Sequence, residues 1–318
     1  MEELDPVLQH ALAETYKVDV VPTSSVNMQK AYVQSRGAPP LPTNPLKGCH
    51  KIYLDMGLNI GEKLFVLFDP LDGPRHRQKP FDWFFGTGKA NRSDVCAVGF
   101  EPNYNLTSRL RRVQTRFQRR GHRVYIFKAA VALDSGTATL FSDTEQDSFH
   151  AWGKTLVKYD GRMGRRNMAT VPTVSLPWLL HSFLAPAPGT SPPRIMAKMD
   201  VEGAEYNLIS VAWPLMCRSI DMLMLERHDR FFKNSWRWKN KLQRTEASGE
   251  GVVRIKRLDD ALAQMKASRS CRTTVTLMHS WEGRGYPDEL AVARNSTTYA
   301  TAFGGLGTLA TSRSFRMG

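Results

Sequence analysis

The stretch Tyr53-Leu-Asp-Met-Gly-Leu-Asn-Ile-Gly-Glu62 marks the point where an apolar strand turns into a helix. Gly57 and Gly61 allow the backbone to turn tightly and to approach a ligand closely, where a side chain would clash. The spacing is G-x-N-x-G after Asp55, whereas dinucleotide sites favour G-x-G-x-x-G, which presents a helix N-terminus to a pyrophosphate. An acid beside the turn suits a cationic or amine-bearing ligand better than a phosphate. A plain turn between a strand and a helix is the simpler alternative.

Outward from this turn, apolar runs alternate with helical patterns along the chain. Several runs are almost continuously apolar, as in parallel strands that are covered on both faces. The alternation predicts an α/β fold with a doubly wound, mostly parallel, Rossmann-like sheet, in which a ligand lies outside the carboxyl ends of the strands. The expected strands are 51–56, 95–100, 124–133, 195–199, 220–225 and 273–278, with 138–141 as a candidate hairpin partner of the third. The expected helices are 60–68, 104–120, 204–213 and 258–267.

The composition predicts three regions within the 318 residues. Residues 1–45 are expected to be an N-terminal extension with a proline-rich linker, because the stretch 38–45 holds four prolines that cannot continue a helix or a sheet ladder. Residues 46–285 are expected to form the domain, with an insertion at about 69–93 that is rich in proline, glycine and charge and is interpreted as a surface excursion. Residues 286–318 are predicted to be a poorly ordered tail.

The net charge, the start of the chain and the cysteines indicate the kind of partner and the location of the protein. A net charge of +14 favours anionic partners in general. No window resembles a transmembrane segment, and the acidic start Met1-Glu-Glu-Leu-Asp5 is unlike a secretory signal, so a cytoplasmic location is expected. The four cysteines form no C-x-x-C pair, and Cys96 and Cys217 are predicted to be buried small hydrophobic residues.

Carboxylates close the other expected strands. Glu101 ends the second strand, where a carboxylate can accept hydrogen bonds from both ribose hydroxyls of a nucleoside, although it lies further from the glycine turn than the roughly 20 residues that are usual. Asp200, Glu202 and Glu205 follow the strand 195–199, and a helix start explains one or two of these acids but not Asp200 at the strand tip. An exposed strand-end acid is the alternative for Glu101.

The strand 220–225 leads into Glu226-Arg-His-Asp229. Alternation along an extended chain would put Glu226 and His228 on the same side. A histidine beside a carboxylate at the carboxyl end of a strand is a candidate catalytic or ligand residue, whereas a structural role is the more common use of a single histidine.

Taken in order, these motifs resemble the FkbM family of S-adenosylmethionine-dependent methyltransferases. The resemblance covers roughly residues 51–228, and its most specific element is Asp200-Val-Glu-Gly-Ala-Glu205. One departure is Ser175-Leu-Pro-Trp178, where family members usually carry Leu-Asp-Asp before the fourth strand. The resemblance implies a class I methyltransferase fold and a transferase activity, generally O-methylation, including that of sugar and polyketide hydroxyls. The other matching segments are Leu54-Asp-Met-Gly-Leu-Asn-Ile-Gly-Glu62, Gly99-Phe-Glu-Pro-Asn103, Ala129-Ala-Val-Ala-Leu-Asp-Ser-Gly136 and Leu225-Glu-Arg-His228.

The expected reaction is methylation of a hydroxyl on a small molecule or glycan, with S-adenosyl-L-methionine as the methyl donor. In this hypothesis Glu101 holds the ribose, Asp200 and His228 are the catalytic candidates on the acceptor side, and Glu202 and Glu226 support them. The methionine and sulfonium side is lined by Asp55, Gly57, Asn59 and Gly61. No metal is expected, although the clustered carboxylates could instead hold a divalent cation.

Two stretches leave room for another class of protein. The segment 109–123 carries seven arginines around the apolar positions Leu110, Val113 and Phe117, which predicts a solvated helix face or a phosphate-contacting patch. Trp236-Arg-Trp-Lys-Asn-Lys241 interleaves aromatic and cationic side chains and could stack on a base or sugar, or cover the cofactor. A basic nucleic-acid-binding protein, or an RNA methyltransferase, is therefore the alternative hypothesis, and a methyltransferase-like fold that has lost activity is a third.

Overall fold

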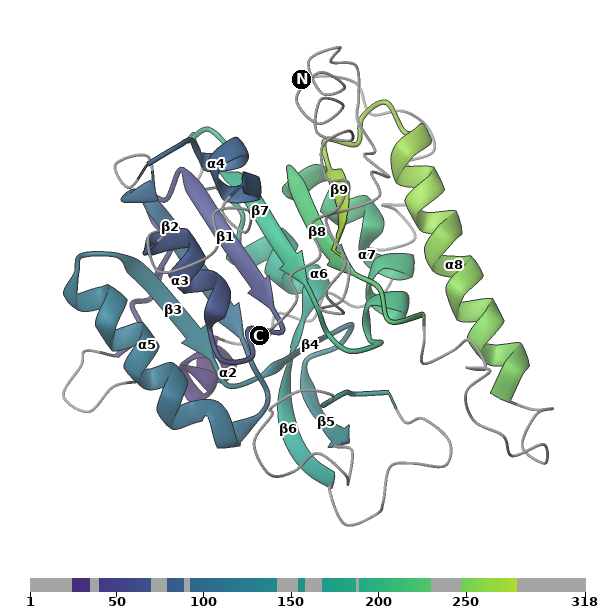
Figure 1. Ribbon diagram of the computed structural model, residues 1–318, viewed down its shortest axis with the longest axis horizontal. Coiled ribbons are helices and arrows are strands. Elements are labelled where there is room, and N and C mark those ends of the chain that lie inside the picture. The colour runs from purple at the N-terminus through teal and green to yellow at the C-terminus, as the bar shows by residue number, and fades with distance from the viewer. Residues whose placement is uncertain are drawn as a thin grey trace, which may run out of the picture.

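The computed structural model describes residues 25–34, 40–69, 79–88, 92–141, 154–157, 168–186, 189–229 and 247–278. Within these residues, six strands form a parallel sheet in the order β3-β2-β1-β7-β8-β9 (Figure 1). The predicted α/β, Rossmann-like architecture, with helices on a central parallel sheet, is confirmed. The strands are β1 (Lys51–Met56), β2 (Val95–Phe100), β3 (Arg123–Phe127), β7 (Arg194–Met199), β8 (Met222–Glu226) and β9 (Thr274–Met278).

The order of the strands puts a topological switch between β1 and β7. From β1 the chain proceeds outward to β2 and β3, then returns to β7 on the other side of β1 and continues to β8 and β9. Asp55 on β1 is thus paired with Gly99 on one side and with Lys198 on the other. Ligands of open α/β sheets bind in the crevice beyond the carboxyl ends of two such strands.

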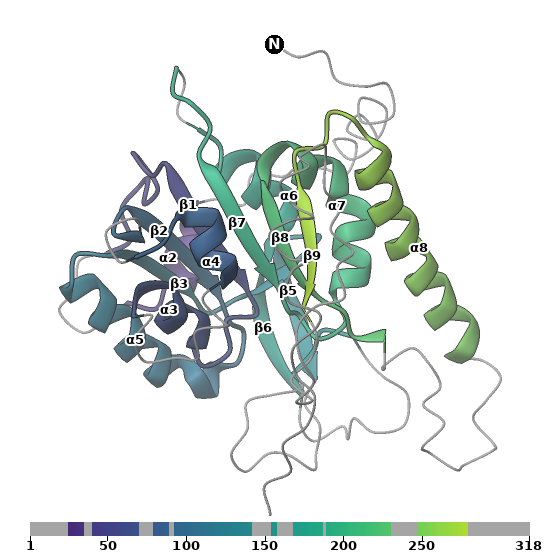
Figure 2. The ribbon, with the colours of Figure 1, turned by 45° about the horizontal axis from the view of Figure 1, so that its top comes forward.

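Helices cover both faces of this sheet (Figure 2). One face carries α3 (Glu62–Phe68), α4 (Lys79–Phe85) and α5 (Thr107–Arg119), and the other carries α7 (Glu205–Ser219) with α8 (Ala247–Ala267) beside it. Neighbouring residues of β1 serve opposite cores: Ile52 and Leu54 pack on the α7 side, and Tyr53 packs on the α3 side. A strand that is buried on both faces needs apolar residues throughout, which explains the nearly continuous apolar runs of the sequence.

A second, smaller sheet lies at the carboxyl ends of the main strands (Figure 1). It has the order β4-β6-β5, in which β4 (Ala130–Ala132) is parallel and β5 (Gly136–Phe141) antiparallel to β6 (Met168–Ser175). The predicted strand 124–133 is therefore two strands in two sheets. The predicted hairpin was wrong, because β5 pairs with β6, which inserts between β4 and β5.

Several helices differ in extent from the prediction. The helix expected at 204–213 continues through Pro214 to Ser219, because the burial of Leu215, Met216 and Cys217 offsets the backbone hydrogen bond that proline removes. The helix expected from residue 258 begins at Ala247. A short helix, η4 (Tyr104–Leu106), precedes α5, and α6 (Leu176–Trp178) and the π-helical turn η5 (Leu179–Phe183) follow β6.

The described part of the insertion 69–93 belongs to the core. The prediction that this region is a surface excursion was therefore wrong for these residues. Helix α4 buries Phe81, whose ring meets that of Tyr53 edge-on at 5.2 Å between centroids. Arg92 is 1% exposed and donates to the carbonyls of Val66 and Leu67, both at 3.1 Å. These carbonyls end α3 and would otherwise lack partners, so the insertion caps the helix that follows the glycine turn.

The N-terminal extension also has a structured part. Helix α2 (Ser25–Ala31) buries Met28 and Ala31, and Val33 donates to the carbonyl of Ile126 at 2.8 Å. The expected tail, 286–318, lies outside the described residues.

All four cysteines are paired in two disulfides, Cys49–Cys96 and Cys217–Cys271. The prediction that Cys96 and Cys217 are buried is confirmed, with exposed fractions of 1% and 0%, but the prediction that they serve as simple hydrophobic residues was wrong. Cys49 precedes β1, Cys96 lies near the start of β2 and Cys271 precedes β9. Both bonds therefore lie toward the amino ends of the strands.

Candidate functional site

A cavity lies beyond the carboxyl ends of β1, β2 and β7, at the topological switch. Its walls come from the glycine turn, the segment after β2, the segment after β7 and the smaller sheet. The lining residues are Gly57, Asn59, Phe100, Glu101, Pro102, Ala130, Val131, Leu140, Lys154, Leu156, Asp200, Val201, Glu202 and Ala204. Of the predicted cofactor residues, Gly57, Asn59 and Glu101 therefore reach one cavity, and Asp200 and Glu202 from the predicted acceptor side reach it too.

Gly57 is required by the close approach of two backbones. It has φ +87, and a Cβ atom built on it would lie 1.8 Å from the carbonyl oxygen of Asp200. Its N–H donates to the carbonyl of Phe100 at 3.1 Å. The glycine turn is thus fixed between the ends of β2 and β7: the tight turn was predicted, but the close approach is to the backbone of Asp200, and the predicted approach to a ligand stays a prediction.

Gly61 has a packing role that the sequence analysis did not assign. It has φ +81, it lies immediately before α3, and a Cβ atom on it would meet the Val113 side chain at 3.3 Å. It is not among the residues that line the cavity. Gly61 therefore permits the close packing of the start of α3 against α5, and its predicted place on the cofactor side stays a prediction.

Asp55 is fully buried and does not line the cavity. Its carboxylate accepts from the Tyr53 hydroxyl at 2.9 Å and from Lys198 Nζ at 3.3 Å. Burial raises the pKa of the Asp55 carboxyl, and the charge of Lys198 opposes that rise. Asp55 therefore acts on the site by holding Lys198.

Lys198 connects the predicted donor and acceptor sides, a role that the sequence analysis missed. Its Nζ donates to the carbonyl of Gly57 at 2.7 Å and lies 3.1 Å from Asp200 Oδ2. Although burial alone would lower the pKa of Lys198, the charges of Asp200 and Asp55 raise it, so the side chain is a cation. The sequence signal that could have found it is a lysine inside an expected parallel strand. Side chains in such strands are usually buried, and Lys198, which is 3% exposed, therefore needs anionic partners.

Glu101 and Asn59 form the cavity wall opposite β7. The Glu101 carboxylate accepts from the backbone N–H of Asn59 at 2.7 Å and of Asn103 at 2.8 Å. Burial raises the pKa of Glu101 to about 7, against the lowering effect of these two N–H groups. Asn59 has φ +52, a left-handed conformation that is uncommon outside glycine and that clusters at functional sites.

The Asn59 side chain has an acceptor atom that forms no hydrogen bond with the described residues. Its Oδ1 is buried and, among the described residues, receives no hydrogen bond. Buried polar atoms in native proteins nearly always have partners, so an orphan on a cavity wall points to a ligand with a donor group.

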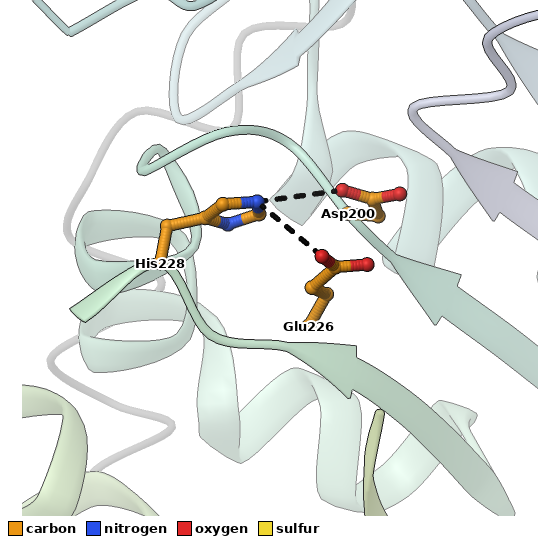
Figure 3. A group of neighbouring side chains, drawn as sticks. All are labelled: Asp200, Glu226 and His228. Atoms are coloured by element: carbon orange, nitrogen blue, oxygen red, sulfur yellow. Dashed lines mark ion pairs between the residues drawn. The ribbon is translucent and has the colours of Figure 1, made fainter. Parts of the chain in front are cut away.

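On the other side of the switch, His228 lies among four carboxylates. Its Nδ1 is 3.0 Å from Glu205 Oε1, and its Nε2 is 3.3 Å from Glu202, 3.7 Å from Asp200 and 3.8 Å from Glu226. Figure 3 shows Nε2 of His228 pointing between the carboxylates of Asp200 and Glu226. The predicted proximity of Glu226 and His228 is confirmed, and Asp200 joins them from the adjacent strand end.

Glu205 positions the imidazole, which the sequence analysis did not assign. It is fully buried, and its Oε1 accepts from the backbone N–H of His228 at 2.9 Å as well as facing Nδ1. Its Oε2 accepts from the N–H of Gly203 at 2.8 Å. One carboxylate thus ties the loop after β7 to the segment after β8 and leaves Nε2 as the nitrogen that faces the other acids.

The electrostatics of this cluster are unusual. Burial would lower the pKa of His228, but the bond to Glu205 and the charges of Glu205, Glu202 and Asp200 raise it to about 9. Burial, with the charge of Asp200, raises the pKa of Glu226 to about 7. The His228 shift follows from the anions around the imidazole, whereas the Glu226 shift follows first from burial and then from the charge of Asp200.

A short segment from the region between β5 and β6 closes the cavity on the side of the smaller sheet. The Thr155 hydroxyl donates to the carbonyl of Glu202 at 2.5 Å, and Lys154 Nζ lies 3.2 Å from Asn103 Oδ1. These contacts connect the loop after β7 with the segment after β2, and Glu202 keeps a left-handed φ of +50 within that loop.

Some arginines of the basic stretch make contacts within the chain, although those of the helix remain exposed. Leu110, Val113 and Phe117 form its buried stripe, as predicted. Arg116 and Arg120 pair with Asp69 at 2.8 and 2.5 Å. Arg109 donates to the carbonyl of Ile60 at 3.3 Å, and Arg123 to that of Pro45 at 2.5 Å. These contacts support the structural interpretation of the stretch, and the segment 236–241 lies outside the described residues.

Comparison of the chain with protein-family models, with curated proteins and with solved structures gave no match. In the described part of the chain, no helix combines the length and the apolar character that crossing a membrane would need.

Proposed function

We propose that the protein is an S-adenosylmethionine-dependent methyltransferase that methylates a hydroxyl group of a small molecule or glycan. The observation that carries the proposal is the convergence of Gly57, Asn59 and Glu101 on one cavity at the topological switch. Such a position is where open α/β sheets bind nucleoside ligands. The motif resemblance to FkbM methyltransferases supplies the choice of cofactor.

The residues present fit that cofactor. Glu101 offers a carboxylate to the two ribose hydroxyls while the N–H groups of Asn59 and Asn103 hold it in place. The orphan Oδ1 of Asn59 suits an ammonium or amino donor. When bound, S-adenosylmethionine supplies a methyl group that is already activated on a sulfonium. The anionic wall formed by Asp200 and Glu202 suits a ligand with positive charge.

On the acceptor side, Asp200 and His228 are the proposed catalytic residues. A hydroxyl must lose its proton as the carbon–oxygen bond forms, and the carboxylates of Asp200 and Glu226, held beside the imidazole of His228, are groups that can receive it. Lys198 and Glu205 are positioning residues, because they hold Asp200 and His228 from behind. Alignment of donor and acceptor by such groups can lower the barrier by about 7 to 11 kcal/mol.

Calorimetry tests the cofactor assignment. We expect S-adenosylmethionine and S-adenosylhomocysteine to bind with one site per chain, and NAD to show no binding, because the turn is G-x-N-x-G and ends beside acids. The test variant is Glu101→Gln on the cavity wall. The matched control is Asp94→Asn, since Asp94 is an exposed acid just before β2 that pairs with Lys51. Weakened binding in the first variant alone supports the proposal. Tight NAD binding without a response to S-adenosylhomocysteine would overturn it.

For the compartment, we infer an oxidising one rather than the cytoplasm expected from the sequence. The two disulfides, Cys49–Cys96 and Cys217–Cys271, account for every cysteine of the chain. Such bonds persist mainly in secretory, extracellular and periplasmic proteins. Mass spectrometry of the unreduced protein from its natural source would reveal both bonds, and free thiols there would refute the inference.

A further inference from the structure

The carboxyl ends of β7 and β8 bring together the donor set of a metal centre. One oxygen each of Asp200 and Glu226 and one nitrogen of His228 lie within 4.8 Å of one another. We propose that these three residues bind one divalent cation of the Mn²⁺ type, with Glu202 as a further ligand. The site goes beyond the proposed methyl transfer and does not depend on it.

The spacing of the ligand atoms supports a shared ion. Nε2 of His228 lies 3.7 Å from Asp200 Oδ1 and 3.8 Å from Glu226 Oε1, and Figure 3 shows the three groups facing a common point. Donor atoms bound to one ion at about 2.1 Å are separated by about 3.0 Å when adjacent and about 4.2 Å when opposite. Glu202 Oε2, at 3.3 Å from the same nitrogen, falls in that range as well. Small side-chain shifts would therefore complete a coordination sphere.

The support behind the imidazole is a second, independent observation. His228 is 1% exposed, and Glu205 faces its Nδ1 at 3.0 Å. Histidines that bind metals commonly use their other ring nitrogen in this way, because a carboxylate behind the ring fixes its orientation and raises the basicity of the binding nitrogen. The arrangement turns Nε2 toward Asp200 and Glu226.

Charge and chemistry indicate the class of ion. Lys198 is the cationic side chain that the described residues place against these acids, and it is shared between Asp55 and Asp200. Asp200, Glu202 and Glu226 therefore exceed the positive charge available nearby. Carboxylates with water favour Mn²⁺ or Mg²⁺, and one imidazole shifts the preference toward Mn²⁺.

A cation here would have a use in the proposed reaction. Asp200 and Glu202 also line the cavity, so an acceptor hydroxyl in that cavity can reach the same ion. A bound cation lowers the pKa of a coordinated oxygen and orients it. This use rests on the proposed function, whereas the site itself does not.

The test is a titration of the chelator-treated full chain with Mn²⁺ in the absence of any methyl donor, followed by calorimetry and by the electron paramagnetic resonance signal of free Mn²⁺. We expect one Mn²⁺ per chain. Asp200→Asn, Glu226→Gln and His228→Gln should each weaken binding at least tenfold, and Asp94→Asn should leave it unchanged. Circular dichroism melts identify any variant that fails to fold, and the isosteric Glu226→Gln, at a half-buried position, keeps the test decisive.

Absence of saturable binding by the wild type, or equal binding by wild type and the three site variants, would overturn the proposal. A separate titration with S-adenosylhomocysteine on the metal-free chain keeps the two proposals distinguishable. Binding of that ligand without Mn²⁺ binding would leave the methyltransferase standing and remove the metal site. The reverse result would keep the metal site and remove the methyltransferase.

Discussion

Glu101 joins three parts of the candidate site through one carboxylate. It directly follows β2, accepts a hydrogen bond from Asn59 in the glycine turn and accepts another from Asn103 in the segment before α5. Its strand position made it predictable, whereas the two backbone bonds require the folded turn. The same carboxylate is buried enough for its pKa to rise to about 7.

Donor affinity should therefore depend on pH. The ribose hydroxyls bind best to the ionised carboxylate, so we expect the affinity for S-adenosylhomocysteine to rise about tenfold between pH 6 and pH 8, and to lose this dependence in Glu101→Gln. Calorimetry at the two pH values measures it. In the ligand-free chain the free energy of unfolding changes with pH in the opposite direction. Because the pKa of Glu101 is raised in the folded chain, its contribution to stability is fully present below the unfolded pKa of about 4.3 and is lost as the pH rises through 7. An affinity that is flat with pH in the wild type would contradict the ribose role.

His228 and Asp200 belong to one unit in this proposal. We expect His228→Ala to lower turnover by about a hundredfold or more, with donor affinity little changed, because general acid–base groups contribute on this scale. Asp200→Asn should lower turnover too, and the double variant should lose less than the product of the two single losses. Steady-state kinetics with a radiolabelled methyl group gives all three values once an acceptor is found.

The control is His181→Ala, at an exposed position in the turn after α6. His228→Gln serves as a second variant, because it keeps a donor that can face the buried Glu205. A lower melting temperature with turnover near wild type would mean that His228 only packs the segment after β8.

At the scale of elements, local signals were enough to find the sheet and the strand ends. The runs of β1, β2, β7 and β8 are mostly apolar in sequence, and the residues that follow them form much of the site. Elements that depend on distant partners were not predictable. Strand β6 is half exposed along its first part, and the two strands with which it pairs precede it by 27 residues or more.

Two further elements show the same limit. The insertion looked like a loop because of its prolines and charges, yet Arg92 completes the end of α3 and the phenylalanines of α4 fill the core on that face. Lys198 could be seen at a strand end, but its partner Asp55 is 143 residues away, so its bridging role needs the fold. The pairing of the cysteines is hidden for the same reason, because their separations of 47 and 54 residues carry no local pattern.

At the scale of the whole molecule, the disulfides and the candidate site occupy opposite ends of the sheet. Cys49–Cys96 and Cys217–Cys271 lie toward the amino ends of the strands, and the cavity lies beyond the carboxyl ends. The disulfides are therefore separated from the cavity by the length of the strands.

Reduction should lower stability and spare the site. Each bond closes a loop of about 50 residues and should contribute about 2 to 4 kcal/mol to the free energy of unfolding. We expect the melting temperature to fall on treatment with dithiothreitol, and the affinity for S-adenosylhomocysteine at 10 °C to stay within about twofold. The double variant Cys49→Ser with Cys96→Ser should reproduce part of the fall. A loss of affinity in the folded, reduced protein would contradict this separation.

The two disulfides also divide the chain into stretches that are enclosed by a cross-link and a stretch that is not. One loop holds 49–96 and the other holds 217–271, so the stretch 97–216 between them carries no cross-link. That stretch contains the smaller sheet, the segment after β2 and the loop after β7, which together form most of the cavity wall. Because a cross-link restricts the chain that it encloses, we expect partial opening at low free energy to be more frequent in this stretch, where a donor and an acceptor would have to enter and leave, than in the two enclosed stretches.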